Sequence, residues 1–135
     1  MSLPQAAFDG ELERVKQLLA DGADIEVEND IGQTALHNAI ENQHAETGEF
    51  LLLAGADVEH DTPGGPSPLV HAIDIETDSA NQRGKEPPDT TLLRLLIKHG
   101  ANVSRRCACG ITPLEMAEKV HNRHAERILI ARHAR

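Results

Sequence analysis

The sequence predicts an all-α protein, a solenoid in which helix-turn-helix units stack and are joined by β-hairpin-like loops. A Leu-rich segment that ends in Gly-Ala occurs three times, with its glycine at Gly22, Gly55 and Gly100. A helix-start segment with Thr or Ser two positions before Leu also recurs, from Thr34, Ser67 and Thr112. Recurrence at a period in this range is typical of a repeat array.

Both segments give the same spacing. In each, 33 residues separate the first copy from the second, and 45 separate the second from the third. The array is therefore regular except for one insertion of 12 residues, the difference between 45 and 33. The insertion falls in the polar stretch 76–88, which ends in two prolines. We expect this stretch to be a mobile excursion between two helices.

Each unit carries start and stop signals for its helices. The leading Thr or Ser can accept a free backbone N–H, and glycine after the Leu-rich segment ends a helix in left-handed backbone. The expected first helices of the units are 3–8, 35–42, 68–75 and 113–120. The expected second helices are 12–20, 45–53, 90–98 and 123–132. The connecting loops have equal length, which indicates one repeated loop geometry, and they are 23–33, 56–66 and 101–111.

The composition fits thin layers of aliphatic side chains in one domain, 1–135. The chain has 135 residues, two Phe, and no Trp or Tyr. No apolar run approaches the roughly 18 residues of a membrane span. The N-terminus has no basic start followed by an apolar stretch, so we expect no secretion signal. Two cysteines in such a chain favour a reducing, cytoplasmic location and argue against a disulfide framework.

These motifs together resemble the ankyrin-repeat family. Residues 29–40, Asn-Asp-Ile-Gly-Gln-Thr-Ala-Leu-His-Asn-Ala-Ile, are similar to the family pattern Asp-x-x-Gly-x-Thr-Pro-Leu-His-x-Ala-Ala. Gly48 stands where the family usually has a branched apolar residue, and it should weaken its helix by up to about 1 kcal/mol relative to Ala. The resemblance covers nearly all of residues 3–132. It implies about four repeats, namely about 1–28, 29–61, 62–106 with the insertion 76–88, and 107–135.

The sequence predicts a non-enzymatic protein without a metal or cofactor. It has no Gly-x-Ser-x-Gly elbow and no phosphate-cradling glycine loop. The resemblance implies that His37 bonds a neighbouring backbone and that His44 is also structural. Two cysteines and two histidines could complete a zinc shell, but an intervening helix of about 12 Å separates them. The cysteines, Cys107 and Cys109, are therefore expected to be surface residues at a hairpin tip.

The resemblance also implies where a partner binds. Members of the family usually bind other proteins through the concave face made by the hairpin tips and the first helices. Carried onto this chain, the partner-binding residues are Asp9, Asp30, Ile31, Gln33, Glu41, Asn42, Pro63, Asp74, Ile75, Cys109, Ile111 and Lys119. Phe8 lies beside them, and we expect it to be partly buried at the N-terminal end of the array.

Charge favours a basic protein as the partner. Residues 1–62 hold 14 acidic and 2 basic side chains, whereas residues 63–135 hold 8 acidic and 11 basic ones. An acidic surface attracts a basic one and repels nucleic acid. Acidic side chains follow the predicted face, namely Asp9, Glu28, Asp30, Glu41, Asp61 and Asp74, and Arg105-Arg106 makes a basic end. We expect no nucleic-acid or membrane partner and a monomer when free.

A narrower hypothesis and two alternatives follow. Small, acidic ankyrin proteins resemble bacterial immunity proteins that neutralise a toxic enzyme, so the chain is expected to inhibit a toxic or basic partner. The first alternative is a metal- or redox-responsive protein that uses Cys107 and Cys109. The second is an enzyme with a site at the insertion 76–88, using His71 or Asp74.

Overall fold

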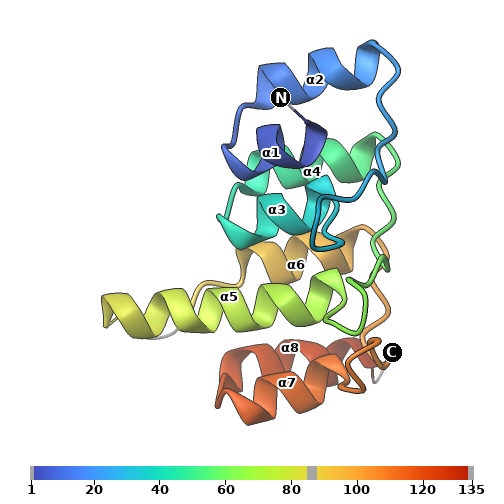
Figure 1. Cartoon of the computed structure of the whole chain (residues 1–135). Helices are drawn as coiled ribbons and strands as arrows, with labels where there is room; N and C mark the ends of the chain where they lie inside the picture. The colour runs from blue at the N-terminus through green and yellow to red at the C-terminus, as the bar shows by residue number, and fades with distance from the viewer. Residues whose placement is uncertain (1, 85–87, 134–135) are drawn as a thin grey trace.

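The computed structural model describes residues 2–84 and 88–133 and places eight α-helices in them. The helices form four pairs that stack in chain order, and loops on one side join each pair to the next (Figure 1). The helices are α1 Leu3–Phe8, α2 Leu12–Ala20, α3 Ala35–Glu41, α4 Ala45–Leu53, α5 Pro68–Arg83, α6 Thr91–Lys98, α7 Pro113–Lys119 and α8 Arg123–His133. The predicted all-α repeat solenoid is confirmed, and α5 alone is much longer than expected.

The four pairs make two layers. The first helices α1, α3, α5 and α7 contact one another in sequence, and the second helices α2, α4 and α6 contact one another behind them. Alanines let α1 and α3 approach closely, since Ala6, Ala7, Ala35 and Ala39 are all fully buried in one cluster. Aliphatic side chains of α3 to α8 form a second cluster. None of the helices in the described residues is long and apolar enough to cross a membrane.

Local signals set the helix ends as predicted. The Ser67 hydroxyl accepts from the backbone N–H of Val70, and Thr112 and Glu115 form a reciprocal capping box at the start of α7. Each bond satisfies a backbone donor that the helix itself leaves free. The glycines that follow α2, α4 and α6 all have positive φ, 95° at Gly22, 103° at Gly55 and 94° at Gly100.

The three connecting loops share one geometry, which confirms the inference from their equal length. Each closes a hairpin with a backbone N–H···O bond, from Asn29 to Gln33 (2.9 Å), from Thr62 to Pro66 (3.2 Å) and from Cys107 to Ile111 (2.9 Å). Each also begins with a side-chain acceptor that binds a backbone N–H two residues on, at Asp24, Asp57 and Asn102 (2.9 Å in all three). Equivalent atoms therefore bond at the 33- and 45-residue spacing.

The insertion differs from its prediction. Residues 76–83 continue α5 as helix, so they are not the excursion that the sequence suggested, while 85–87 lie outside the described residues. Glu76, Thr77 and Ala80 are buried, and α5 ends at Gly84, which has a φ of 64°. The C-terminal end of α5 consequently projects beyond the other first helices (Figure 1).

A buried carboxylate anchors this longer helix. Glu76 is 3 % exposed, and its two oxygens accept from the backbone N–H groups of Leu92 (2.9 Å) and Leu93 (3.1 Å) at the start of α6. These donors have no partner inside α6, so Glu76 caps a helix from 16 residues upstream. Burial raises the pKa of Glu76 to about 7, although the two backbone bonds act in the opposite direction.

Glu76 should make the stability of the protein depend on pH. Its pKa is about 7 in the folded protein against 4.5 ordinarily, so its contribution to stability is lost as the pH rises through this range. Between pH 5 and pH 8 the free energy of unfolding of the wild type should fall by about 2 kcal/mol relative to Glu76→Gln, which does not titrate. Urea unfolding of both proteins at the two pH values measures this difference.

The comparison of these two proteins also removes the effect of a buried histidine. Burial lowers the pKa of His37 to about 4, so its contribution to stability is lost as the pH falls from 6.5 towards 4. That dependence has the opposite sign and is common to both proteins. Parallel pH profiles for the wild type and Glu76→Gln would contradict the role given to Glu76.

Gly48 offers a test of helix propensity. It is buried in α4, where an added Cβ would lie 3.8 Å from the side chain of Leu95 and 4.0 Å from that of Ala39, both ordinary contacts. Gly48→Ala should therefore raise the free energy of unfolding by about 0.5–1 kcal/mol, because alanine loses less backbone entropy. Urea unfolding checks it, with Gly55→Ala as the matched control. Gly55 has a φ of 103°, so the same substitution there should lower stability.

Candidate protein-binding surface

The twelve residues predicted to bind a partner are all accessible. Eight are exposed and four are half-buried; the half-buried ones are Gln33, Glu41, Ile75 and Ile111. The structure does not gather them in one cluster. It places six at the hairpin tips and six towards the C-terminal ends of the first helices (Figure 1). A partner that contacts both groups must span the layer of first helices.

The hairpin-tip group is built by the backbone of each loop. Asn29 Oδ1 accepts from the N–H groups of Ile31 (3.0 Å) and Gln33 (2.9 Å), which holds the first tip in shape. Ile31 itself is 71 % exposed. The Pro63 ring packs so closely on Gly32 that a side chain at Gly32 would overlap it. Neighbouring tips are thus in contact, and Ile31 presents an apolar side chain to solvent.

The helix-end group lies beside the projecting part of α5. Asn42 Nδ2 donates to the carbonyl oxygen of Phe8 (2.8 Å), and His44 Nε2 contacts the same oxygen (3.0 Å). His71 Nε2 and Glu41 Oε2 lie 2.5 Å apart as an ion-pair contact. A hollow of about 290 Å³ separates this edge from α5, and it is lined by Glu41, Gln43, Ile75, Asp78, Ser79, Gln82 and Arg83. Phe8 has 37 % of its surface exposed.

Four residues of this hollow were missed by the sequence prediction, because the insertion was expected to leave the helix. They are Asp78, Ser79, Gln82 and Arg83. A signal for the longer helix exists in the sequence. Residues 76–83 contain no glycine or proline, and Gly84 follows them as a helix C-terminus would require.

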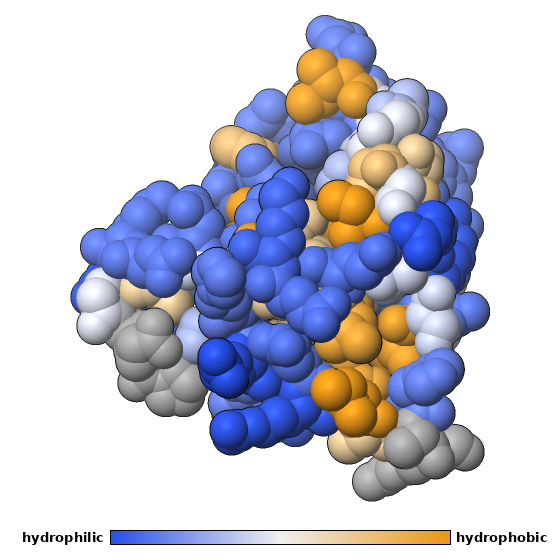
Figure 2. All heavy atoms as spheres, turned by 90° about the horizontal axis from the view of Figure 1, so that it is seen from below, coloured by the Kyte–Doolittle hydropathy of each residue, from blue (hydrophilic) through white to orange (hydrophobic). Residues whose placement is uncertain are grey.

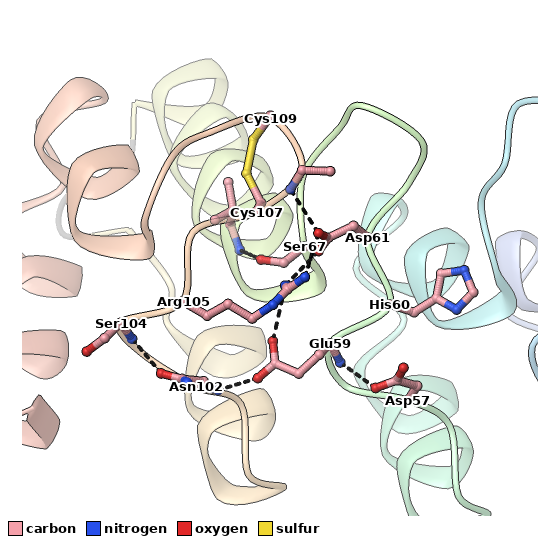
Figure 3. A network of polar contacts seen from close by, with 12 residues as sticks. Asp57, Glu59, His60, Asp61, Ser67, Asn102, Ser104, Arg105, Cys107 and Cys109 are labelled. Carbon is pink, nitrogen blue, oxygen red and sulfur yellow. Dashed lines mark hydrogen bonds and ion pairs between the residues drawn. A yellow bond between two sulfur atoms is a disulfide. The ribbon is translucent and has the colours of Figure 1, made fainter.

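Ion pairs and backbone bonds join each loop to the next, and we call each such set a loop clasp (Figure 3). In the second clasp the Arg105 guanidinium donates to both oxygens of Asp61 (2.8 and 2.7 Å) and lies 3.6 Å from Glu59. Asp61 Oδ2 also accepts from the N–H of Ala108 (2.8 Å), and Glu59 Oε2 accepts from that of Asn102 (2.5 Å). Two carboxylates of one loop therefore hold a cation and two backbone donors of the next.

The first clasp repeats this arrangement one unit earlier. The ring nitrogens of His60 lie 3.1 Å from Glu26 and 3.2 Å from Glu28, and Glu26 Oε2 accepts from the N–H of Asp57 (2.7 Å). Glu26 and Glu28 precede Glu59 and Asp61 by 33 residues, and His60 precedes Arg105 by 45. The register of the sequence repeat is thus also the register of the ion pairs.

The clasps correct the predicted charge pattern. Glu28 and Asp61 were expected to lie free on an acidic face, but both bind the neighbouring loop. The basic end is also internally bonded, since Arg105 binds Asp61 and Arg106 donates to Glu115 (2.8 Å) and to the Gly110 oxygen (2.6 Å). Part of the acidic excess of the N-terminal half is therefore structural.

Burial alone would raise the pKa of Asp61. The hydrogen bonds from Arg105 and Ala108 outweigh this effect and hold the pKa of Asp61 below its usual value. The same pairing raises the pKa of Arg105. Both groups are consequently charged at neutral pH, and the clasp is an ion pair.

The structural roles expected for two histidines are confirmed. His37 is fully buried, and its Nε2 lies 2.6 Å from the carbonyl oxygen of His60. Because a carbonyl only accepts, Nε2 carries the proton of a neutral ring, in keeping with the lowered pKa of His37. The ring of His44 lies over Gly10, which has a φ of 70° and leaves no room for a Cβ.

The expectation for the cysteines was wrong in two respects. Cys107 and Cys109 form a disulfide bond, although the sequence argued against one. Only Cys109 is exposed, and Cys107 is 5 % exposed. Within the described part of the chain, no group of three or more His, Cys, Asp or Glu side chains could hold a metal ion.

Similar proteins share this repeat. A family model described as "Ankyrin repeats (3 copies)" matches residues 3–81. The B-cell lymphoma 3 protein homolog of Mus musculus is 37% identical over 107 residues, which cover 75% of this chain and 21% of that protein. The RelA-associated inhibitor of Mus musculus is 32% identical over 125 residues, covering 92% of this chain and 14% of that protein.

The fold and these similarities define a helical repeat protein with hairpin tips, and the chain belongs to the ankyrin-repeat family. A third relative, the human Ankyrin repeat and KH domain-containing protein 1, is 39% identical over 112 residues, with 83% of this chain covered. The chain spans only about a fifth or less of the length of these three relatives. What they share with it is the repeat region.

Asp61→Asn should show how much a loop clasp contributes. The substitution removes the negative charge beside Arg105 and turns one accepting oxygen into a donor. It should lower the free energy of unfolding by about 2 kcal/mol at neutral pH. Because the pKa of Asp61 is below 3.8, its contribution is present above that pH. The difference from wild type should shrink as the pH falls below it.

Asp57→Asn is the matched control. Asp57 Oδ1 accepts one N–H in its loop, and Asn102 accepts the equivalent bond one repeat later. This control should change stability by less than about 0.5 kcal/mol. Urea unfolding compares the three proteins, and equal losses in both variants would show that the clasp has no special weight.

Proposed function

We propose that the chain is a non-enzymatic binding module that inhibits a partner protein with a basic surface. Ankyrin repeats mediate protein–protein interaction, and one relative is itself named an inhibitor. The observation that carries the proposal is the row of accessible side chains on the hairpin tips and first helices. Ile31 is the main one, because 71 % of it is exposed and it has no packing role in the fold.

The chemistry of this surface favours a basic partner. Asp9, Asp30 and Asp74 are exposed along it and lie outside the loop clasps. Apolar side chains at the centre of an interface contribute affinity, while charges around them raise the association rate. Such a surface has an apolar contact at Ile31 with acidic neighbours. It should therefore bind faster at low ionic strength than at high ionic strength.

The narrower proposal is that the protein acts in the cytoplasm as an immunity-type inhibitor, one that covers the working surface of a toxic enzyme. The acidic charge of the chain supports this reading, as does the projecting end of α5. That end extends the surface beyond the ordinary width of the stack. If the proposal is right, equimolar protein should abolish the activity of the purified partner. A partner that keeps full activity in the complex would overturn the inhibitory role.

A matched pair of substitutions tests the surface. Ile31 at the first hairpin tip and Leu53 at the end of α4 are both 71 % exposed, but only Ile31 lies on the proposed surface. Ile31→Asp should weaken partner binding by at least about tenfold, because it places a charge in an apolar contact. Leu53→Asp should leave affinity unchanged.

The measurement is affinity capture from the native host at low salt, followed by titration of the recovered protein. Wild type and Leu53→Asp should recover the same partner, and Ile31→Asp should recover less of it. Equal recovery by all three proteins would contradict the proposed surface. Equal loss in both variants would point to a surface elsewhere or to a general effect of added charge.

A further inference from the structure

The disulfide bond takes the place of a hydrogen bond in the repeat. In the first loop, Asn29 Oδ1 accepts from the N–H of Ile31 and so ties the two ends of the tip together. The residues 78 positions later in the repeat register, 33 and then 45, are Cys107 and Cys109. There the tie is the covalent S–S bond. One of the three tips is thus held by a bond that can be reduced.

The tip that carries the disulfide also takes part in the second loop clasp (Figure 3). The residue between the two cysteines, Ala108, donates its N–H to Asp61 (2.8 Å). The N–H of Cys109 donates to the carbonyl oxygen of Gly65 in the preceding hairpin (3.1 Å). Both donors lie on the short ring that the S–S bond closes. Their direction depends on that ring, so the S–S bond is coupled to the contact between the third and fourth units.

We propose that Cys107 and Cys109 form a thiol–disulfide exchange site, and that reduction releases the fourth hairpin from the third while the rest of the array stays folded. The ring contains only three residues, so the bond restricts the unfolded chain very little and its effect is local. In a reducing compartment, protein disulfides are usually transient or redox-sensing. The proposal does not depend on the identity of a partner protein.

Exposure sets the direction of the reaction. A thiolate of an external dithiol attacks the exposed sulfur of Cys109, the S–S bond breaks, and Cys107 leaves as the thiolate. The second thiol of the reagent then displaces Cys109 and closes its own disulfide. Two electrons pass to the protein, and the two protons of the dithiol end on the two cysteine sulfurs.

Reduced and oxidised dithiothreitol are the probe. The full chain is equilibrated in a series of mixtures, and free thiols are counted by alkylation and mass measurement. Both thiols should appear together, and oxidation should remove both. Protein that is fully exposed to air yet keeps two alkylatable thiols would overturn the proposal.

Amide hydrogen exchange tests the coupling. After reduction, the Ala108 N–H should exchange at least about tenfold faster, because its bond to Asp61 opens locally. The Ile31 and Gln33 amides of the first tip serve as the internal control and should not change. Unchanged exchange at Ala108 would overturn the proposal, and so would faster exchange throughout the array.

Two variants separate the covalent bond from the shape of the tip. In the double variant Cys107→Ser with Cys109→Ser, the Ala108 amide should exchange as fast as in the reduced wild type. In Cys107→Asn with Cys109→Ser, the side chain can accept as Asn29 does, so protection of Ala108 should return and should not respond to dithiothreitol. Exchange that responds to dithiothreitol in either variant would show that the effect does not come from the cysteines.

Discussion

The order of this stack depends on carboxylates that reach from one loop to the next. Glu59 and Asp61 bind Arg105 and two backbone N–H groups of the following loop, and Glu26 and Glu28 bind His60 and its loop in the same way. Apolar layers between helices are not directional and could slide. Paired charges bonded to backbone donors fix the register and angle of each loop on its neighbour.

A second buried carboxylate has the same kind of role between helices. Glu76 caps α6 from inside α5, and Thr77 accepts from Asn122 Nδ2 (2.9 Å) at the start of the last helix. Burying such groups is costly unless their bonds are made. Here the bonds are made with backbone and amide donors, and a polar insertion therefore becomes two ordered helical turns. The added turns give the first-helix layer an edge that the other units lack.

The three hairpin tips show how one backbone shape carries different chemistry. The tip at Asn29 is held by a side-chain amide, whereas the tip at Cys107 is held by a sulfur–sulfur bond. The backbone bond that closes each hairpin is the same in all. The side chains beyond it are free to vary, as Ile31 and Pro63 do, since the fold requires little of them. Recognition can therefore change from tip to tip while the stack is kept.

The sequence by itself determined the repeat, seven of the eight helices to within a residue or two, and the common loop geometry. These features come from local signals, such as the cap at Thr112 and the glycine after each Leu-rich helix. Only the tertiary structure decided the length of α5, the pairing of Arg105 with Asp61, and the bond between the cysteines. The charged partners are 44 residues apart in the chain, and residues 76–83 are helical because distant donors satisfy them. The accessibility of the predicted binding residues followed from their register, whereas their division between two edges followed from packing.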